Sequence, residues 1–288
     1  MSTFMNRAAL LLLALATPMA ANAAPAKSKG KVLVVMSGGH VLELPDHKAY
    51  ATGYYLNELA TPLHAIIDAG YTPVFASPNG DAPTMDASSN DAKFFGGDNG
   101  KRMETLRFID GLKELRHPQT LASVVGHTKD YVGVFVPGGH APMVDLAKDK
   151  NLGKILISFH EMKRPTALIC HGPIALLSTL PEAEQFDKAV NAGNTSALPS
   201  LAHGFPYAGY HVAVFSKAEE QQIEQGQLGG RAPYYTDEAL AAAGAQLQNA
   251  APWKPNAVED RELLTGQQPF SDIAFAQAFV GKLDKVSK

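Results

Sequence analysis

The only cysteine of the chain, Cys170, ends an apolar run and is followed directly by a histidine and a glycine, in the sequence ICHGP. A thiolate is a strong nucleophile, and a histidine beside the thiol can accept its proton. A sharp strand-to-helix turn would hold Cys170 in a strained backbone conformation with its side chain exposed, and Gly172 supplies the residue without a side chain that such a turn needs. A lone cysteine after an apolar strand is also a common buried hydrophobe, so His171 is what favours a catalytic thiol.

A second glycine-containing turn could complete this site. The sequence VPGGHAPMVDL, residues 136–146, leaves an apolar run and turns at Gly138 and Gly139. Backbone N–H groups in this turn could hold an oxyanion, and the free N–H groups of a helix that starts after Cys170 could hold one too and lower the pKa of the thiol. We take Gly138, Gly139 and His140 as candidates for oxyanion or substrate binding, although a plain tight turn would give the same pattern.

Alternating strand and helix patterns position these residues. Short apolar runs predict strands, and three- and four-residue spacing of apolar side chains predicts helices. Because parallel strands place their carboxyl ends at one edge, Cys170 falls where open sheets of this kind bind ligands. The fold class is therefore α/β, a doubly wound, mostly parallel sheet with helices on both faces. The expected strands are 31–36, 72–76, 131–136, 166–169 and 211–215, and the expected helices are 52–69, 103–115 and 271–283.

Composition limits the domain organisation and the partners. The chain has 288 residues and a formal net charge of −3, and no basic run suggests nucleic acid as a partner. Residues 1–23 have the pattern of a signal peptide with an Ala21-Asn22-Ala23 cleavage site, which predicts export to a periplasm and no membrane attachment afterwards. Residues 24–288 then form one domain, in which 77–130 is a weakly patterned cap or insert. One cysteine allows no internal disulfide.

Several motifs resemble one protein family. ICHGP and PGGHAPMVDL are similar to the ThiJ/PfpI superfamily, and TGYYLNELATP, residues 52–62, resembles the first helix of its HchA branch. The carboxy-terminal sequences RAPYYTDEALAAAGA and DRELLTGQQPF resemble the same branch, so the likeness extends over nearly all of the mature chain. The branch includes stress-induced chaperones and glutathione-independent glyoxalases. The resemblance implies a flavodoxin-like sandwich, in agreement with the pattern of elements.

The resemblance also implies roles for individual residues. Cys170 would be the nucleophile and His171 its partner, and Glu220 would complete the triad, with Glu219 as a one-residue alternative. Glu58 matches the helix glutamate that hydrogen-bonds the thiol in the family. By its sequence context alone, Glu58 would be a solvated charge on a helix. If it is desolvated, its carboxyl would have a raised pKa and could move a proton. The chain departs from the branch at Ala141, where a glycine usually follows GGH. Some relatives carry a metal site in the cap, but no histidine spacing here predicts one, so we expect neither metal nor organic cofactor.

These roles together predict conversion of a small aldehyde substrate. A Cys-His-Glu site of this kind would turn 2-oxoaldehydes such as methylglyoxal into 2-hydroxy acids such as D-lactate, a lyase activity of the glyoxalase III type. Alternatives are a protein deglycase, an amidase or peptidase of the same superfamily, and a non-enzymatic holdase chaperone. The sequence argues against a glutamine amidotransferase, because no H-x-E triplet follows Cys170. Homodimers are common among relatives, but the sequence shows no interface.

Overall fold

The computed structural model describes residues 28–286 and contains a seven-stranded sheet of order β10-β11-β7-β6-β1-β4-β5. Neighbouring strands run parallel except for β10, which pairs antiparallel with β11 at one edge. This arrangement confirms the predicted doubly wound α/β class. The strands are β1 (Lys31–Val35), β4 (Thr72–Ser77), β5 (Gln119–Thr120), β6 (Tyr131–Val136), β7 (Thr166–Ile169), β10 (Ala257–Asp260) and β11 (Leu263–Gly266).

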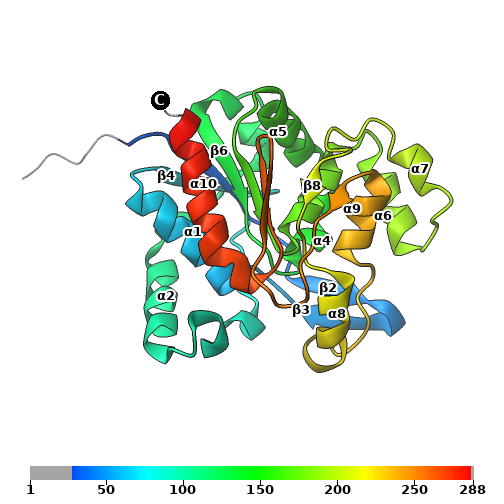
Figure 1. Cartoon of the computed structure of the whole chain (residues 1–288), viewed down its shortest axis with the longest axis horizontal. Helices are drawn as coiled ribbons and strands as arrows, with labels where there is room; N and C mark the ends of the chain where they lie inside the picture. The colour runs from blue at the N-terminus through cyan, green and yellow to red at the C-terminus, as the bar shows by residue number, and fades with distance from the viewer. Residues whose placement is uncertain (1–27, 287–288) are drawn as a thin grey trace, which may run out of the picture.

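Two apolar cores lie on the two faces of the sheet, because successive side chains of a strand point to opposite sides. In β1, Val32 and Val34 belong to the core under helices α1 and α10, whereas Leu33 and Val35 belong to the core on the other face. Figure 1 shows α1 and α10 side by side over one face, with α5 on the other side of the sheet. The helices are α1 (Leu56–Asp68), α2 (Asn99–Gly111), α3 (Leu121–Val124), α4 (Ala141–Val144), α5 (Lys150–Glu161), α6 (Ala183–Asn191), α7 (Leu198–Leu201), α8 (Lys217–Ile223), α9 (Thr236–Ala243) and α10 (Asp272–Val286).

The strand predicted at residues 211–215 is wrong in length and in place. Only β8 (His211–Val212) is a strand, and it pairs with β9 (Gln246–Leu247) in a separate two-stranded sheet. The next backbone N–H groups are bonded to side chains instead: Ala213 N–H donates to Thr265 Oγ1 and Val214 N–H to Asn249 Oδ1. On the side of β7 away from β6, the main sheet therefore continues with β11.

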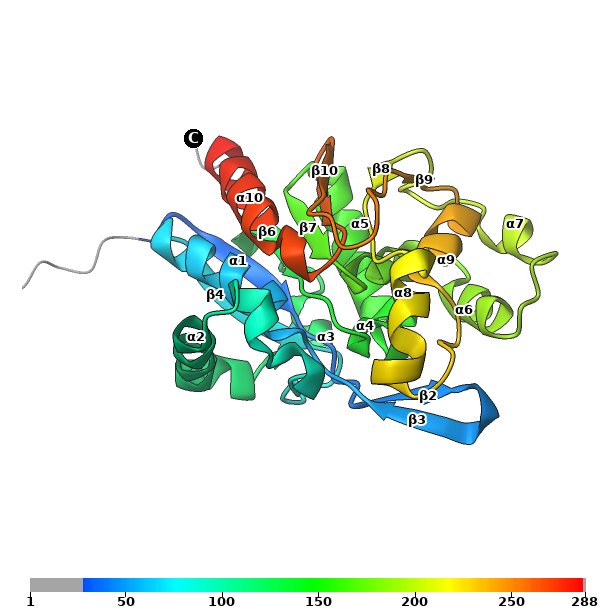
Figure 2. The same ribbon diagram turned by 60° about the horizontal axis from the view of Figure 1, so that its bottom comes forward.

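A hairpin follows β1 and a cap segment follows β4, so both leave the carboxyl ends of their strands. The hairpin consists of β2 (Val41–Leu44) and β3 (Lys48–Ala51), which project from the body in Figure 2. Residues 78–118 contain η3 (Ala92–Phe95) and α2, which starts four residues before the predicted helix 103–115 and ends at Gly111. The Asp98 side chain caps α2 by accepting from the N–H groups of Gly100 and Lys101, so the helix begins there.

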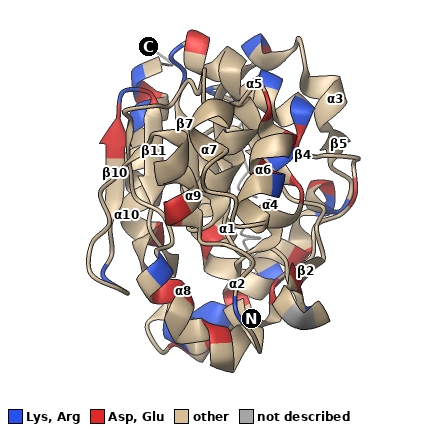
Figure 3. Cartoon of the chain, turned by 90° about the vertical axis from the view of Figure 1, so that its right-hand side faces the viewer, with Lys and Arg blue, Asp and Glu red and all other residues tan. Residues whose placement is uncertain are grey.

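Charged residues of both signs are interspersed over the elements seen in Figure 3, as the balanced composition implies. Among residues 28–286, no helix has both the length and the apolar character needed to span a membrane. The predicted leader, residues 1–23, lies outside the described part of the chain.

Candidate active site

Cys170 occupies the turn between β7 and η7, a 3-10 helix over Gly172–Thr179. Its φ of 62° is the left-handed conformation, which costs a residue with a side chain about 1–3 kcal/mol, and this confirms the strained turn expected from the sequence. Two backbone bonds hold it: Cys170 N–H donates to the Gly266 carbonyl at 2.8 Å, and Phe215 N–H donates to the Cys170 carbonyl at 3.0 Å. A side chain at position 172 would come within 2.7 Å of the Val136 carbonyl oxygen, so only glycine fits there.

The cysteine, His171 and Glu220 form a hydrogen-bonded chain. His171 Nε2 lies 2.7 Å from Glu220 Oε2, and His171 Nδ1 lies 3.3 Å from the Cys170 sulfur. An ionised carboxylate only accepts hydrogen bonds, so Nε2 carries the proton and Nδ1 presents a lone pair to the thiol. Burial lowers the pKa of His171 to about 4, and the charge of His140 adds to this effect. At neutral pH the imidazole is therefore unprotonated and able to accept the thiol proton.

Glu220, rather than its neighbour Glu219, lies against His171. Glu220 and Glu219 both lie in the first turn of α8, whose amino-terminal cap is Ser216. The Glu219 side chain accepts from the Ser216 N–H and hydroxyl, and also from the Trp253 N–H. Glu219 thus caps the helix and fixes a neighbouring loop, which leaves Glu220 to orient the imidazole.

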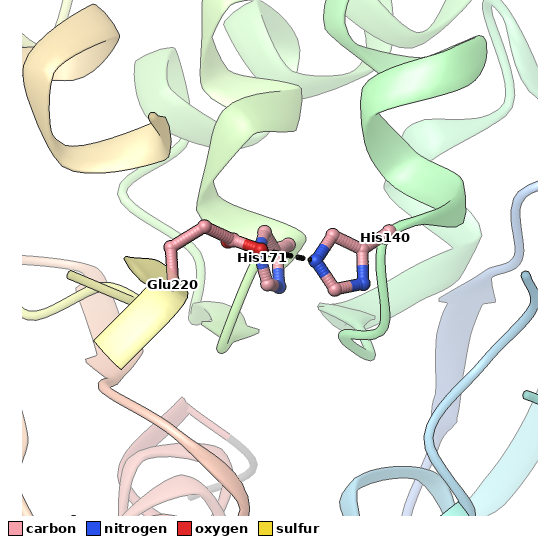
Figure 4. A group of neighbouring side chains, drawn as sticks. All are labelled: His140, His171 and Glu220. Carbon is pink, nitrogen blue, oxygen red and sulfur yellow. Dashed lines mark hydrogen bonds and ion pairs between the residues drawn. The ribbon is translucent and has the colours of Figure 1, made fainter. Parts of the chain in front are cut away.

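A second imidazole, His140, also binds Glu220. Its Nε2 lies 2.7 Å from Glu220 Oε1, and its ring centroid is 4.0 Å from that of His171. Figure 4 shows how the three side chains lie together. Burial is the largest single effect and would lower the pKa of His140, but the charge and the hydrogen bond of Glu220, together with the charge of Asp86, outweigh burial and raise it. Burial likewise opposes ionisation of Glu220, but His140 and His171 hold the pKa of that carboxyl well below its usual range. The raised pKa of His140 favours its protonated form beside the Glu220 carboxylate, whereas the lowered pKa of His171 favours the neutral form. The His140 side chain binds Glu220, and His140 also lines the cavity, so its expected part in substrate binding stays a prediction.

Glu58 lies beneath the cysteine and is completely buried, with 0% of its surface exposed. It belongs to the first turn of α1 and is therefore not the solvated helix charge that its sequence context suggests. Burial raises the pKa of Glu58 well above its ordinary value, and the nearby Cys170 thiol and Gly139 N–H oppose this rise without cancelling it. Neither carboxylate oxygen of Glu58 makes a hydrogen bond within normal geometric limits. A side chain at Gly138 would collide with both Cys170 Cβ and Glu58 Oε2, so this glycine permits the thiol and the carboxyl to approach each other.

The prediction that the Cys170 thiol has a lowered pKa is wrong. Cys170 is only 2% exposed, and burial raises the pKa of its thiol well above the ordinary value, with the charge of Glu58 raising it further. The N–H groups of Gly139 and His171 favour the thiolate but do not outweigh these effects. Two buried acids side by side resist double ionisation, so the Cys170–Glu58 pair keeps at least one proton near neutral pH.

The cysteine opens onto a cavity of about 260 Å³. Its polar groups are concentrated around Cys170 and His171, and Gly139 and His140 lie in the same wall. The rest of the lining is mostly aromatic and apolar and consists of Tyr55, Phe94, Phe215, Ile223, Trp253, Pro269 and Phe270, with Lys93 and Gln227 as further polar residues. No sequence pattern marks these residues as cavity lining, because they come from six separate segments with no shared motif.

His140, His171 and Glu220 are also the residues that could hold a metal ion. Each offers one donor atom, and these atoms lie within 4.8 Å of one another. The imidazole nitrogens and carboxylate oxygens are already bonded to each other through protons, so a cation would have to displace both protons. The group is also distinct from a cap site, since its members follow β6 and β7 and belong to α8.

Comparison with known proteins places this geometry in a family. The ThiJ/PfpI family-like sequence profile matches residues 50–225, which is more than half of the chain. The chain therefore belongs to the ThiJ/PfpI-like family.

Individual relatives agree with this assignment. The chain is 29% identical over 262 residues to a protein/nucleic acid deglycase HchA of Staphylococcus aureus, covering 88% of this chain and 80% of the relative. Its fold matches glyoxalase III of Candida albicans with a TM-score of 0.67 at 20% identity, covering 88% and 97% of the two chains. It also matches the Rapid Encystment Protein of Francisella tularensis with a TM-score of 0.65 at 24% identity, covering 88% and 99%. At these identities the two structures show a shared fold.

Proposed function

We propose that this protein converts 2-oxoaldehydes into 2-hydroxy acids without glutathione. The observation that carries the proposal is the placement of one thiol between two groups that can move protons. The Cys170 sulfur lies 3.3 Å from the unprotonated Nδ1 of His171. The second group beside the sulfur is the buried carboxyl of Glu58. Such a conversion needs a nucleophile that holds the aldehyde and a base that moves one proton between adjacent carbons.

The reaction begins with attack of the Cys170 sulfur on the aldehyde carbon. A preformed thiolate is unnecessary, because the thiol proton passes to His171 Nδ1 as the carbon–sulfur bond forms. The Gly139 and His171 N–H groups, which face the sulfur, stabilise the oxyanion of the resulting hemithioacetal. His140 holds Glu220 in place, and Glu220 keeps the His171 imidazole oriented and balances the charge that it gains.

The second stage moves a proton from the former aldehyde carbon to the neighbouring carbon. Glu58 takes this proton as a carboxylate, giving an enediol, and returns it to the adjacent carbon. A raised pKa makes Glu58 a stronger base than an ordinary carboxylate. The product on the enzyme is a thioester, and water attacks it to release the 2-hydroxy acid and the free thiol. The net reaction adds one water to the 2-oxoaldehyde and needs no redox partner.

A deglycase is the second candidate function, since the curated relative at 29% identity carries that name. Removal of an aldehyde adduct from protein or nucleic acid could use the same thiol attack. A larger substrate would have to present its adduct to a cavity of about 260 Å³, which favours free aldehydes as substrates.

The test is turnover of methylglyoxal by the wild type and by Cys170→Ala. We expect the wild type to produce lactate and Cys170→Ala to produce none while keeping its circular dichroism spectrum. Turnover by Cys170→Ala would refute the proposal. Parallel assays with glycated protein and with peptides separate the deglycase and the peptidase, and suppression of client aggregation by Cys170→Ala would indicate a holdase.

A further inference from the structure

The cavity above Cys170 is much larger than methylglyoxal requires. Its volume of about 260 Å³ equals the share of roughly nine water molecules in the liquid, at about 30 Å³ each. Methylglyoxal would occupy only the end next to the thiol, and the remaining walls would stay in contact with water. Those walls are aromatic and apolar, so water next to them is unfavourable.

One row of aromatic rings comes from the residue that precedes α1, the cap segment and the 3-10 helix Pro269–Ser271 before α10. The Tyr55 and Phe94 rings meet edge to face with their centroids 5.1 Å apart, and Phe94 and Phe270 lie 5.6 Å apart. All three line the cavity. Tyr55 and Phe94 are buried in the free protein, so this part of the wall is formed before a ligand arrives.

A second row continues directly from the catalytic imidazole. Phe215 stacks on the His171 ring with centroids 4.6 Å apart, and Trp253 meets Phe215 edge to face at 5.8 Å. Trp253 has a φ of 63°, a strained conformation that two hydrogen bonds maintain: its N–H donates to Glu219 Oε1 and its indole Nε1 to Gln222 Oε1. Strain of this kind persists only where the surroundings hold the residue in place, so the indole is a fixed wall.

The charged lining residue does not counter this apolar character. The Lys93 ammonium lies 3.5 Å from Asp91 and 4.8 Å above the Phe94 ring, and its side chain is 58% exposed. Its charge is therefore partnered and near solvent. Apart from Lys93 and Gln227, the polar lining residues lie at the end of the cavity where the reaction takes place, and Phe215 and Trp253 continue the lining from His171.

We propose that the preferred 2-oxoaldehyde carries a flat, apolar substituent of about the size of a phenyl ring on its ketone carbon. This inference rests on the proposed function and names the substrate class of the same site. A phenyl ring would displace water from the aromatic rows and pack against them with the edge-to-face or offset geometry that aromatic rings favour. The aldehyde would still reach the sulfur, because the two reacting carbons are the polar end of the molecule.

The reaction keeps the same atom balance for an aromatic substrate. The sulfur adds to the aldehyde carbon, one proton moves from that carbon to the carbon bearing the ring, and one water releases the acid. Phenylglyoxal and water thus give mandelate, with no oxidant and no change in the ring.

The first experiment compares kcat and KM for methylglyoxal and phenylglyoxal in the wild type and in two variants. Phe270→Ala removes a half-exposed ring of the first row, 36% exposed, and Ile273→Ala is the matched control, at 62% exposure and outside the lining. We expect the wild type to favour phenylglyoxal at least tenfold in kcat/KM. Phe270→Ala should reduce that preference at least fivefold and Ile273→Ala should retain it. Equal kcat/KM for the two aldehydes, or a preference unchanged by Phe270→Ala, would overturn the inference.

The second experiment separates this inference from the proposed function. Binding of mandelate and of lactate to Cys170→Ala is measured by calorimetry, which requires no turnover. Mandelate should bind at least tenfold more tightly than lactate, and adding Phe270→Ala should reduce the difference. Equal binding would refute the aromatic preference even if methylglyoxal is turned over, whereas absent turnover with tight mandelate binding would refute only the glyoxalase reaction.

Discussion

Glu220 is held by His140 as firmly as by His171, because each imidazole Nε2 lies 2.7 Å from one of its two carboxylate oxygens. His140 and Glu220 are 80 positions apart in the sequence, and each is 2% exposed. The acid that orients the His171 imidazole is therefore itself oriented and neutralised by a second imidazole. His140 is a positioning residue in this arrangement, since it contacts Glu220 and not the thiol.

Replacing His140 should change the ionisation of His171. The charge of His140 contributes to the low pKa of His171, about 4, so His140→Gln should raise that pKa toward the ordinary value of histidine. Loss of one anchor on Glu220 should also lower kcat by about tenfold, as loss of orienting hydrogen bonds typically does. An NMR titration of the His171 ring together with steady-state kinetics measures both effects. His127→Gln, at an exposed position, is the control, and a His171 pKa that stays near 4 in His140→Gln would contradict this account.

Replacing Glu58 should affect both catalysis and the thiol. The Glu58 charge helps to raise the pKa of Cys170, so Glu58→Gln should lower that pKa, while the loss of the proton-moving carboxylate should reduce kcat at least about a hundredfold. The ultraviolet absorbance of the thiolate, followed against pH with Cys170→Ala as the blank, gives the first quantity. Glu43→Gln, on the exposed side of β2, should change neither. A thiol pKa that rises in Glu58→Gln would contradict the assigned interaction.

The pH dependence of turnover should follow the ionisation of Glu58. Because its pKa is raised, Glu58 remains protonated above its ordinary pKa of 4.5 and becomes a base only at higher pH, so kcat/KM should increase with pH above 4.5. His171 does not limit this range, since its pKa of about 4 leaves it unprotonated throughout. A kcat/KM profile measured from pH 4.5 upward tests this; a constant rate down to the acid end would exclude Glu58 as the base.

Glu220 should stabilise the fold in a pH-dependent way. Its pKa is lower in the folded state than in the unfolded chain, so its contribution is present above the ordinary carboxyl pKa and is lost as the pH falls through the folded value. At pH 7, Glu220→Gln should cost about 3 kcal/mol of unfolding free energy, because it breaks a buried ion pair. Urea unfolding at neutral and acid pH measures the difference, which should shrink in acid. Glu238→Gln, in an exposed pair with Lys217, should cost little at either pH.

A side chain at position 138 should separate the thiol from Glu58. Gly138→Ala places a methyl group against Cys170 and Glu58 within a packed region, with an expected cost of about 1–3 kcal/mol and loss of turnover. Gly281→Ala is the matched control, because nothing lies within 4 Å of the new methyl group and the position is inside α10. It should stabilise the protein by up to about 1 kcal/mol. Thermal unfolding and a turnover assay distinguish the two variants.

The strands next to the site could be predicted from the sequence, because strands buried on both faces appear as continuous apolar runs. The bounds of β6 and β7 match the predicted strands at residues 131–136 and 166–169. The run at 211–215 is equally apolar, yet its backbone is satisfied by the side chains of Thr265 and Asn249. Local pattern cannot show which partner a backbone N–H will find, so this strand was misplaced.

The environment of the site was less predictable than its residues. Cys170, His171, Glu220 and Glu58 are close together in the structure, but the sequence indicated an exposed thiol with a lowered pKa. Whether the pKa of the Cys170 thiol is raised or lowered depends on how deeply the thiol is buried and on which charge lies beside it. In the structure Glu58, from α1, and Cys170 both pack against Gly138. The bond between His140 and Glu220 also joins distant segments and has no local signal.

The single thiol of the chain lies at the base of the cavity, so any reagent that labels a cysteine labels this position alone. Intact-mass spectrometry after treatment with iodoacetamide would then report the fraction of molecules whose nucleophile is still reduced and accessible. Rates from different preparations can be normalised to that fraction, so oxidised enzyme is not mistaken for slow enzyme.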